Sequence, residues 1–252
     1  MNLLADPVTL AVVALAVVLL GLAKGGLSGV GALATPMAAL VLPPTIAAAL
    51  LLPILIVQDV VSVWSFRKTW DGWIIAWMLP GAAIGIAAGY YYAERVDEAK
   101  LMAALGAITL AFGVYRLWVE RGGHIVAASK SPGWVGTFFG AFTGFTSQIA
   151  HAGGPPFQMW VTPRRLPHLV FVGTSSILFA LINWMKVPAY LALGAFPHEV
   201  LVAAALLMPL AIGSTLLTVR WLKRIDGARF YSFIYWLMVL LGAKLLWDGL
   251  AG

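Results

Sequence analysis

The chain has 252 residues, of which 62% are hydrophobic and 10% are charged. Soluble globular proteins carry about 45–50% apolar and about 25% charged residues, so this composition excludes an aqueous surface over most of the molecule. Apolar stretches close to the roughly 20 residues that cross a bilayer as a helix recur along the whole chain. The sequence therefore predicts an all-α integral membrane protein that has the lipid bilayer as its main partner.

The chain contains no cysteine, which excludes disulfides and thiolate metal sites. Its net charge of +6 comes from basic residues at the ends of apolar stretches. That distribution is typical of membrane orientation and does not indicate a nucleic-acid partner.

In chain order, apolar segments are predicted at about 8–22, 31–42, 45–66, 73–92, 99–118, 134–150, 154–162, 168–186, 198–219 and 229–248. Segment 8–22 has no basic region before it and no A-x-A-like cleavage site, so we interpret it as retained and not as a signal peptide. Segments 31–42 and 154–162 are too short to cross about 30 Å of hydrocarbon at about 1.5 Å per residue. They are predicted to be half-helices.

An internal repeat relates the two parts of the chain, because residues 80–118 align without gaps onto residues 209–247. The shared positions include Pro80 with Pro209, Arg95-Val96-Asp97 with Arg224-Ile225-Asp226, Gly113 with Gly242, and Leu117-Trp118 with Leu246-Trp247. Thr35-Pro36 and Thr162-Pro163 also match at a slightly different offset. We expect a first membrane repeat at 1–120, a linker at 121–133 and a second repeat at 134–252. Each repeat has about five segments, and an odd number makes the second copy inverted.

The basic residues predict the orientation of the chain. With the amino terminus outside, twelve of them fall on the inner side: Lys24, Arg67, Lys68, Arg116, Arg121, Lys130, Arg164, Arg165, Arg220, Lys223, Arg224 and Arg229. Four fall on the outer side: Arg95, Lys100, Lys186 and Lys244. This excess obeys the positive-inside rule, so we expect both termini outside, in a bacterial inner membrane.

Each repeat begins with a stretch rich in glycine and proline, at residues 21–36 and 140–156. Such stretches break helices, and broken backbone is tolerated at membrane depth only where protein buries it or where it lines a wet cavity. Discontinuous helices at matching positions of inverted halves point to a transporter's substrate site, and their amides and positive ends favour an anion. The alternative for such glycines is close helix packing, which we expect of Gly81, Gly85 and Gly89.

Polar side chains accompany both breaks, and they supply the candidate binding residues. The predicted substrate-binding residues are Lys24, Gly25, Gly26, Ser28, Gly29 and Thr35 in the first break, and Thr146, Ser147, Gln148, His151, Gly153, Gly154 and Gln158 in the second. Lys24 is equally explained as a loop lysine at the inner interface. His151 is the one histidine away from a loop or segment end, which suggests a proton or anion role.

Asp59 lies within segment 45–66, and an intramembrane carboxylate is a functional hypothesis by default. Asp59 and His151 are therefore the candidates for proton coupling. The alternative for Asp59 is a structural pair with Arg67 or Lys68. Asn183 occupies a comparable place in the second half, and a hydrogen bond between helices explains it equally well.

No Walker loop, H-E-x-x-H or G-x-S-x-G motif occurs in the sequence, so no enzyme activity, cofactor or metal is expected. The glycine-rich break followed by Thr-Pro, repeated in the second half as Phe-x-Gly…Ala-Gly-Gly-Pro-Pro, resembles the TauE/SafE family of sulfite exporters, also called the four-toluene-sulfonate uptake permeases. The resemblance covers nearly the whole chain and implies secondary transport of sulfur-containing anions. It maps the family's glycine motifs onto Gly25, Gly26, Gly29, Gly31, Gly144, Gly153 and Gly154. Here Gln148 and His151 precede the paired glycines, a departure that leaves the particular anion open.

The expected function is secondary transport, by alternating access, of a small sulfur-containing anion such as sulfite, thiosulfate or sulfoacetate. Oxyanion hydrogen bonds from Ser28, Thr146, Ser147, Gln148 and Gln158, backbone amides of both breaks, and the charge of Lys24 or protonated His151 are the expected binding groups. The alternatives are a transporter of small organic carboxylates, an anion channel, and a membrane-embedded assembly factor. Homodimer formation is left open.

Overall fold

The computed structural model describes residues 5–27, 29–123, 130–221 and 228–251. At residues 221 and 228–231 it describes the backbone alone. It is built from helices, which are α1 (Pro7–Lys24), the 3-10 helix Val30–Leu33, α2 (Ala34–Ala38), α3 (Pro44–Phe66), α4 (Gly72–Arg95), α5 (Glu98–Glu120), α6 (Gly133–Ala150), α7 (Gly154–Val161), the 3-10 helix Thr162–Arg164, α8 (His168–Ala192), α9 (His198–Trp221) and α10 (Ala228–Ala251). Seven of these helices, α1, α3, α4, α5, α8, α9 and α10, are long and apolar enough to cross a membrane. The predicted all-α integral membrane fold is confirmed.

Aspartates outside the apolar segments mark where three long helices begin. Asp6 accepts a hydrogen bond from the backbone N–H of Thr9 at 2.8 Å, and Asp97 accepts one from that of Lys100 at 2.8 Å. Asp71 caps α4 in the same way. A carboxylate at this position satisfies amides that have no partner within the helix and complements the positive end of the helix dipole. Three of the chain's ten acidic residues therefore mark the starts of helices.

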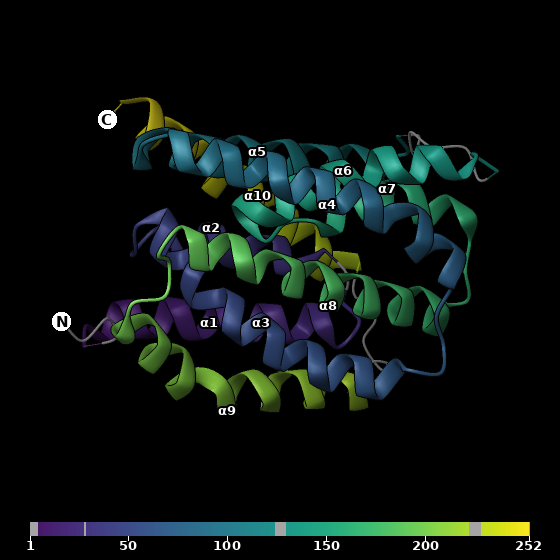
Figure 1. The fold of residues 1–252 in the computed structure, drawn as a ribbon, viewed down its shortest axis with the longest axis horizontal. Helices are drawn as coiled ribbons and strands as arrows, with labels where there is room; N and C mark the ends of the chain where they lie inside the picture. Colours follow the sequence, from purple (N-terminus) through teal and green to yellow (C-terminus); the bar gives the residue numbers. More distant parts are fainter. Residues whose placement is uncertain (1–4, 28, 124–129, 222–227, 252) are drawn as a thin grey trace.

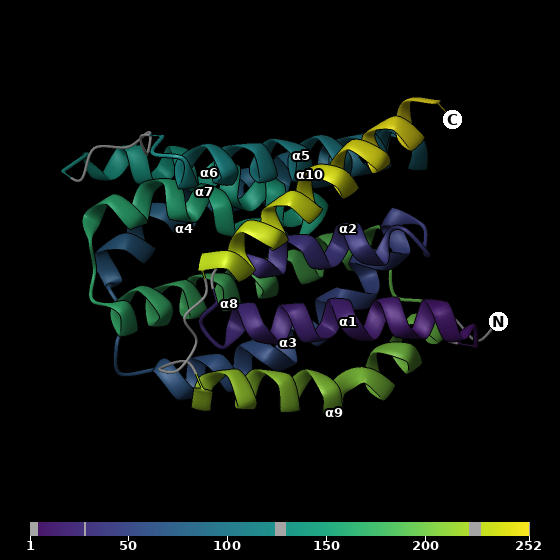
Figure 2. The same cartoon turned by 180° about the vertical axis from the view of Figure 1, so that it is seen from behind.

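The helices form two layers, as Figures 1 and 2 show from opposite sides. One layer contains α4, α5, α6 and α10, in which α4 packs along α6 and α5 along α10. The other contains α1, α3, α8 and α9, with contacts of α3 to both α8 and α9. The short elements that follow α1 and α6 lie within this arrangement and do not extend across it.

Glycines allow the helices of the first layer to approach closely. A Cβ added at Gly81 or Gly85 would lie 1.9 or 2.0 Å from a backbone carbonyl oxygen of α6, and one added at Gly144 would lie 2.1 Å from the oxygen of Ala82 on α4. A Cβ at Gly89 would lie 2.8 Å from the side chain of Gln148. The prediction that Gly81, Gly85 and Gly89 serve helix packing is confirmed.

Both termini lie at the same end of the molecule (Figure 1). In the first half, α1, α3 and α5 run away from this end and α4 runs toward it (Figures 1 and 2). In the second half the directions are opposite, because α6, α8 and α10 run toward this end and α9 runs away from it. The helix contacts are also similar in the two halves when helices five numbers apart are compared. The pair α4 and α6 corresponds to the pair α9 and α1, and the pair α3 and α9 corresponds to the pair α8 and α4. The inverted repeat itself, and the side of the membrane on which the termini lie, stay predictions.

Two basic residues are not where the loop assignment placed them. Lys186 was expected on the outer side, but α8 continues to Ala192 and the Lys186 side chain is fully buried inside the molecule. Arg116 was expected in an inner loop, yet it lies within α5 and donates to side chains of α7 and α10. In both cases a cation stays within the helix because acceptors from other helices surround its charge. Lys223 and Arg224 lie outside the described residues.

Candidate functional site

Both predicted breaks are present as interruptions of helices. After α1 ends at Lys24, Gly26 and Gly29 have φ angles of 122° and 96°, a conformation that glycine adopts at little cost. The chain then turns into the short 3-10 helix and α2. In the second break α6 ends at Ala150, His151 has a φ of 51°, and α7 begins at Gly154. Neither α1 nor α6 continues into the short helix that follows it.

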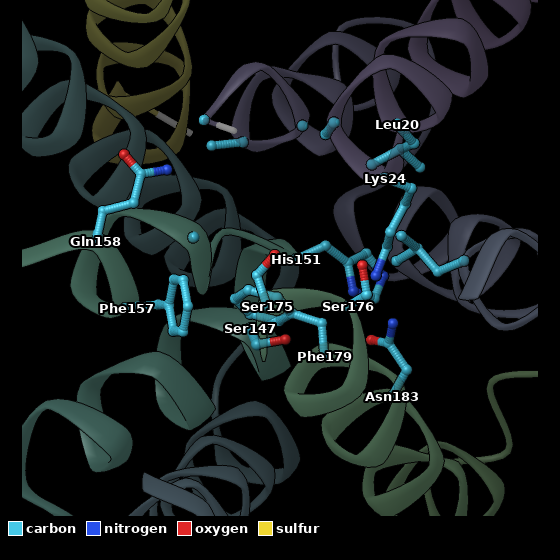
Figure 3. Close-up of a pocket in the computed structure, with 16 residues that line it drawn as sticks. Leu20, Lys24, Ser147, His151, Phe157, Gln158, Ser175, Ser176, Phe179 and Asn183 are labelled. Carbon is cyan, nitrogen blue, oxygen red and sulfur yellow. The ribbon is translucent and has the colours of Figure 1, made fainter. Parts of the chain in front are cut away.

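The two breaks meet at a cavity of about 80 Å³. Because a buried water needs roughly 10–15 Å³ of such volume, the cavity has room for several waters or one small ion. Figure 3 shows side chains from α1, α6, α7 and α8 around it. The lining residues are Leu20, Ala23, Lys24, Gly29, Gly31, Ala32, Leu55, Ser147, His151, Gly154, Phe157, Gln158, Ser175, Ser176, Phe179 and Asn183.

Six of the predicted binding residues line this cavity, two from the first break and four from the second: Lys24, Gly29, Ser147, His151, Gly154 and Gln158. The structure thus brings together residues that are more than 100 positions apart in the chain. Ser28 lies outside the described residues.

Other predicted binding residues lie elsewhere. A Cβ at Gly25 would sit 2.3 Å from Thr218 Cβ, which places this glycine against α9. Thr146 donates to the carbonyl oxygens of Phe142 and Ala152, at 2.8 and 3.1 Å, and so closes the end of α6.

The remaining predicted residues are Gly26, Thr35, Gln148 and Gly153, which are absent from the cavity lining. Thr35 is fully buried in α2 and its hydroxyl has no hydrogen-bond partner. Gly153 packs near Phe179 and the carbonyl oxygen of Thr143.

Lys24 forms a salt bridge with Asp59. Its ammonium donates to Asp59 Oδ1, and Asn183 Nδ2 donates to Asp59 Oδ2 at 2.6 Å. Only 2% of the Asp59 side chain and 12% of the Lys24 side chain are exposed, so this is a buried ion pair that joins α1, α3 and α8. The alternative pairing of Asp59 with Arg67 or Lys68 is wrong. The expected role of Asn183 in a hydrogen bond between helices is confirmed.

His151 and Lys186 form a second polar cluster with Ser147. The Lys186 ammonium lies 2.6 Å from His151 Nδ1, 3.1 Å from the Ser147 carbonyl oxygen and 3.2 Å from Ser147 Oγ. The other ring nitrogen of His151, Nε2, lies 2.9 Å from the carbonyl oxygen of Ala48 on α3. The histidine therefore connects α3 with α8 at the point where α6 ends.

Gln158 is oriented by an arginine. Arg116 donates to Gln158 Oε1 at 3.0 Å and to the Tyr235 hydroxyl at 2.6 Å. The amide nitrogen of Gln158 is left near both breaks, since a Cβ at Gly29 or Gly154 would lie 3.6 or 4.0 Å from it. A donor on α7 is thus fixed at the place where the two interruptions meet.

A second cavity, of about 520 Å³, lies on the other side of the His151 cluster. Ala48, Gln148 and Tyr190 are among its lining residues. The His151 ring, which lines the first cavity, stacks on the Tyr190 ring with centroids 6.1 Å apart. The Tyr190 hydroxyl donates to the Gln148 carbonyl oxygen at 3.0 Å. The contacts of His151 with Ala48 and Tyr190 therefore form a layer that connects the linings of the two cavities.

Apart from Asn183, sequence reasoning missed the contribution of α8 to the site. Ser175 and Ser176 line the cavity, and Ser176 Oγ lies 2.6 Å from Ser62 Oγ. The signal available in the sequence was the polar run Thr174-Ser175-Ser176 in the middle of an apolar segment. Lys186 was missed because a charged residue at the end of an apolar run was interpreted as the end of the helix.

Comparison with known proteins identifies the relationship. Residues 13–245 match the family described as Sulfite exporter TauE/SafE. The chain belongs to the TauE/SafE family. This membership confirms the resemblance found in the sequence and assigns the chain to a family of membrane transporters of sulfur anions such as sulfite. No curated protein and no solved structure matched the chain.

Proposed function

We propose that this TauE/SafE protein is a secondary transporter that binds a small sulfur-containing anion in the cavity between its two helix breaks. The observation that carries the proposal is the meeting of Gly29 and Gly154, one from each break, at the same cavity as the fixed amide of Gln158. Inverted halves with discontinuous helices are the arrangement in which transporters hold substrates near the membrane midplane. The family match supplies the class of substrate.

The groups at the cavity suit an oxyanion, which only accepts hydrogen bonds. Arg116 occupies Gln158 Oε1, so the Gln158 NH₂ group is the part of the amide available to a ligand. Ser147 Oγ accepts from Lys186, which leaves the Ser147 hydroxyl proton for the ligand. Phe157 and Phe179 provide an apolar wall, suited to the organic part of a sulfonate.

Backbone amides contribute less than the sequence suggested. Pro155 and Pro156 follow Gly154 at the start of α7, and proline has no N–H group. The N–H of Phe157 already donates to the Gly153 carbonyl oxygen at 3.3 Å. The side chain of Gln158, one residue further, supplies the donor that this helix end lacks.

Alternating access is the mechanism that we propose, and the layer between the two cavities is its gate. The second cavity adjoins Thr45, Gly194 and Pro197, near the end of the molecule that holds both termini. Breaking the contact of His151 with Ala48 and that of Tyr190 with Gln148 would join this cavity to the binding site. Proton coupling through His151 or Asp59 is a further part of the hypothesis.

Transport in liposomes tests the proposal. Purified protein is reconstituted with internal unlabelled sulfite, and uptake of labelled sulfite by counterflow is measured with and without a pH gradient. We expect counterflow that saturates, that Gln158→Leu weakens, and that the control Thr109→Val leaves unchanged, because the Thr109 hydroxyl bonds to Leu105 of its own helix. Conductance without counterflow would indicate a channel. Transport that is insensitive to the pH gradient and to both His151→Gln and Asp59→Asn would exclude proton coupling.

The substrate class is tested separately by thermal unfolding with sulfite, thiosulfate, sulfoacetate, taurine and lactate. We expect stabilisation by sulfur oxyanions, since a ligand that binds only the folded state raises its stability. Stabilisation by lactate alone would favour a carboxylate transporter. Binding of none of these compounds would favour an assembly factor.

A further inference from the structure

Lys186 is a buried cation whose contacts are all with neutral groups. Its side chain has 0% exposure. Its three hydrogen-bond acceptors are the carbonyl oxygen and Oγ of Ser147 and the Nδ1 atom of His151. Among the residues that the structure describes, no carboxylate forms a salt bridge with it. An ammonium has three N–H donors, so each of them has a partner and the charge has none.

The contacts of His151 constrain the charge that it shares with Lys186. A backbone carbonyl oxygen only accepts, so His151 Nε2 carries the hydrogen in the bond to Ala48. With Lys186 as an ammonium, His151 Nδ1 accepts from it and the ring is neutral. The pair together holds one positive charge.

Charge balance at the site leaves this positive charge unmatched. Lys24 and Asp59 cancel each other as an ion pair. The other titratable group against His151 is Tyr190, which is neutral when it donates to Gln148. The Arg116 guanidinium is directed to Gln158 and Tyr235. A buried charge without a counterion is unfavourable, and the adjacent cavity is the place where an anion would compensate it.

We propose that Lys186, and not Lys24, provides the charge that binds the anion, and that it acts through Ser147. The ammonium donates to Ser147 Oγ, which polarises the Ser147 hydroxyl that faces the cavity. The site then matches an anion with one negative charge, such as a sulfonate or hydrogensulfite. This inference rests on the proposed anion transport and deepens it by naming the charge of the ligand and the residue that balances it.

Binding of methanesulfonate to the purified full chain, measured by calorimetry, tests the inference with two variants. Lys186→Met keeps the length of the side chain and removes its charge, and we expect a loss of affinity of about tenfold or more, as for a bond to a charged group. Its thermal stability without ligand should equal or exceed that of the wild type, because a buried charge is removed. Lys24→Met/Asp59→Asn keeps the net charge of the site, and we expect a smaller loss of affinity than in Lys186→Met.

Equal binding by Lys186→Met and wild type would overturn the inference, and so would a loss in the double variant as large as that in Lys186→Met. If Lys186→Met does not fold, Ser147→Ala decides the question, because it keeps the lysine and removes the hydroxyl that faces the cavity. Wild-type affinity in Ser147→Ala would overturn the proposal, and a loss of about tenfold would support it. Failure of the wild type to bind any sulfur anion would instead refute the proposed function.

Discussion

Gly85→Ala tests the close approach of α4 and α6, on which the position of the second break depends. The added Cβ would lie 2.0 Å from the carbonyl oxygen of Ala141 and 2.6 Å from the amide nitrogen of Phe145. Ordinary van der Waals contact begins at 3.4 Å, so the distance from the added Cβ to the Ala141 oxygen is 1.4 Å too short. Because both atoms belong to the backbone, a change of rotamer cannot relieve the clash and the helices must separate.

The matched control is Gly213→Ala in α9, where an added Cβ meets no atom within 4 Å. Both substitutions gain up to about 1 kcal/mol of helix propensity. Only Gly85→Ala incurs the cost of overpacking, about 1–3 kcal/mol or more. We expect Gly213→Ala to be neutral or stabilising and Gly85→Ala to be less stable than it by about 1–3 kcal/mol or more.

Unfolding by sodium dodecyl sulfate in mixed micelles, followed by circular dichroism, measures this difference. Counterflow of sulfite by the folded fraction then reports whether the second break has moved. Identical unfolding midpoints for the two variants would refute the close packing of α4 and α6.

Three further predictions concern the site and its surroundings. Gln158→Leu should weaken anion binding about tenfold, because one hydrogen bond to a charged ligand is lost, and calorimetric titration with sulfite measures this; unchanged affinity would remove the Gln158 amide from the site. Since the chain has no cysteine, Ala195→Cys in the second cavity should react with an impermeant maleimide added on the side of the termini, and reaction only from the opposite side would contradict the proposed access path. Asp97→Asn should lower thermal stability at neutral pH, because hydrogen bonds from the side chain and then the backbone of Lys100 hold the Asp97 pKa below 3.8. A lowered pKa contributes stability above its unfolded value that is lost as the pH falls, so the two unfolding temperatures should converge below pH 3.8, and a constant gap would contradict the assignment.

The sequence predicted the helices well because membrane helices are selected for local apolar length. Segment 45–66 corresponds to α3 at Pro44–Phe66, and the short segment 154–162 corresponds to α7. The prediction was least accurate at the end of α8, where it stopped at Lys186 although the helix continues to Ala192. The acceptors that allow a lysine inside this helix belong to Ser147 and His151, 39 and 35 positions away. Local hydropathy contains no information about such partners.

The site was predictable in part for the same reason. Gly29 and Gly154 were found because a break in a membrane helix is a local signal in composition. Ser175 and Ser176 reach the cavity only through the packing of α8 against α3. The ion pair of Lys24 with Asp59 likewise joins two helices, and its residues are 35 positions apart in the chain. The sequence therefore indicated where the backbone is interrupted, and the tertiary structure determined which charges are left unmatched there.

We propose that the basic residues of this chain serve two separate purposes, orientation in the membrane and binding of the anion. Lys24, Arg116 and Lys186 were counted toward orientation, yet each has its charge directed to partners within the helix bundle. Without them, ten basic residues remain on the predicted inner side and three on the outer side, so the orientation prediction does not depend on the site. Substituting a loop arginine should consequently affect topology without affecting anion affinity, whereas Lys186→Met should do the reverse. In this proposal, a lysine that water solvates orients the chain, and a lysine surrounded by neutral acceptors beside a cavity binds the ligand.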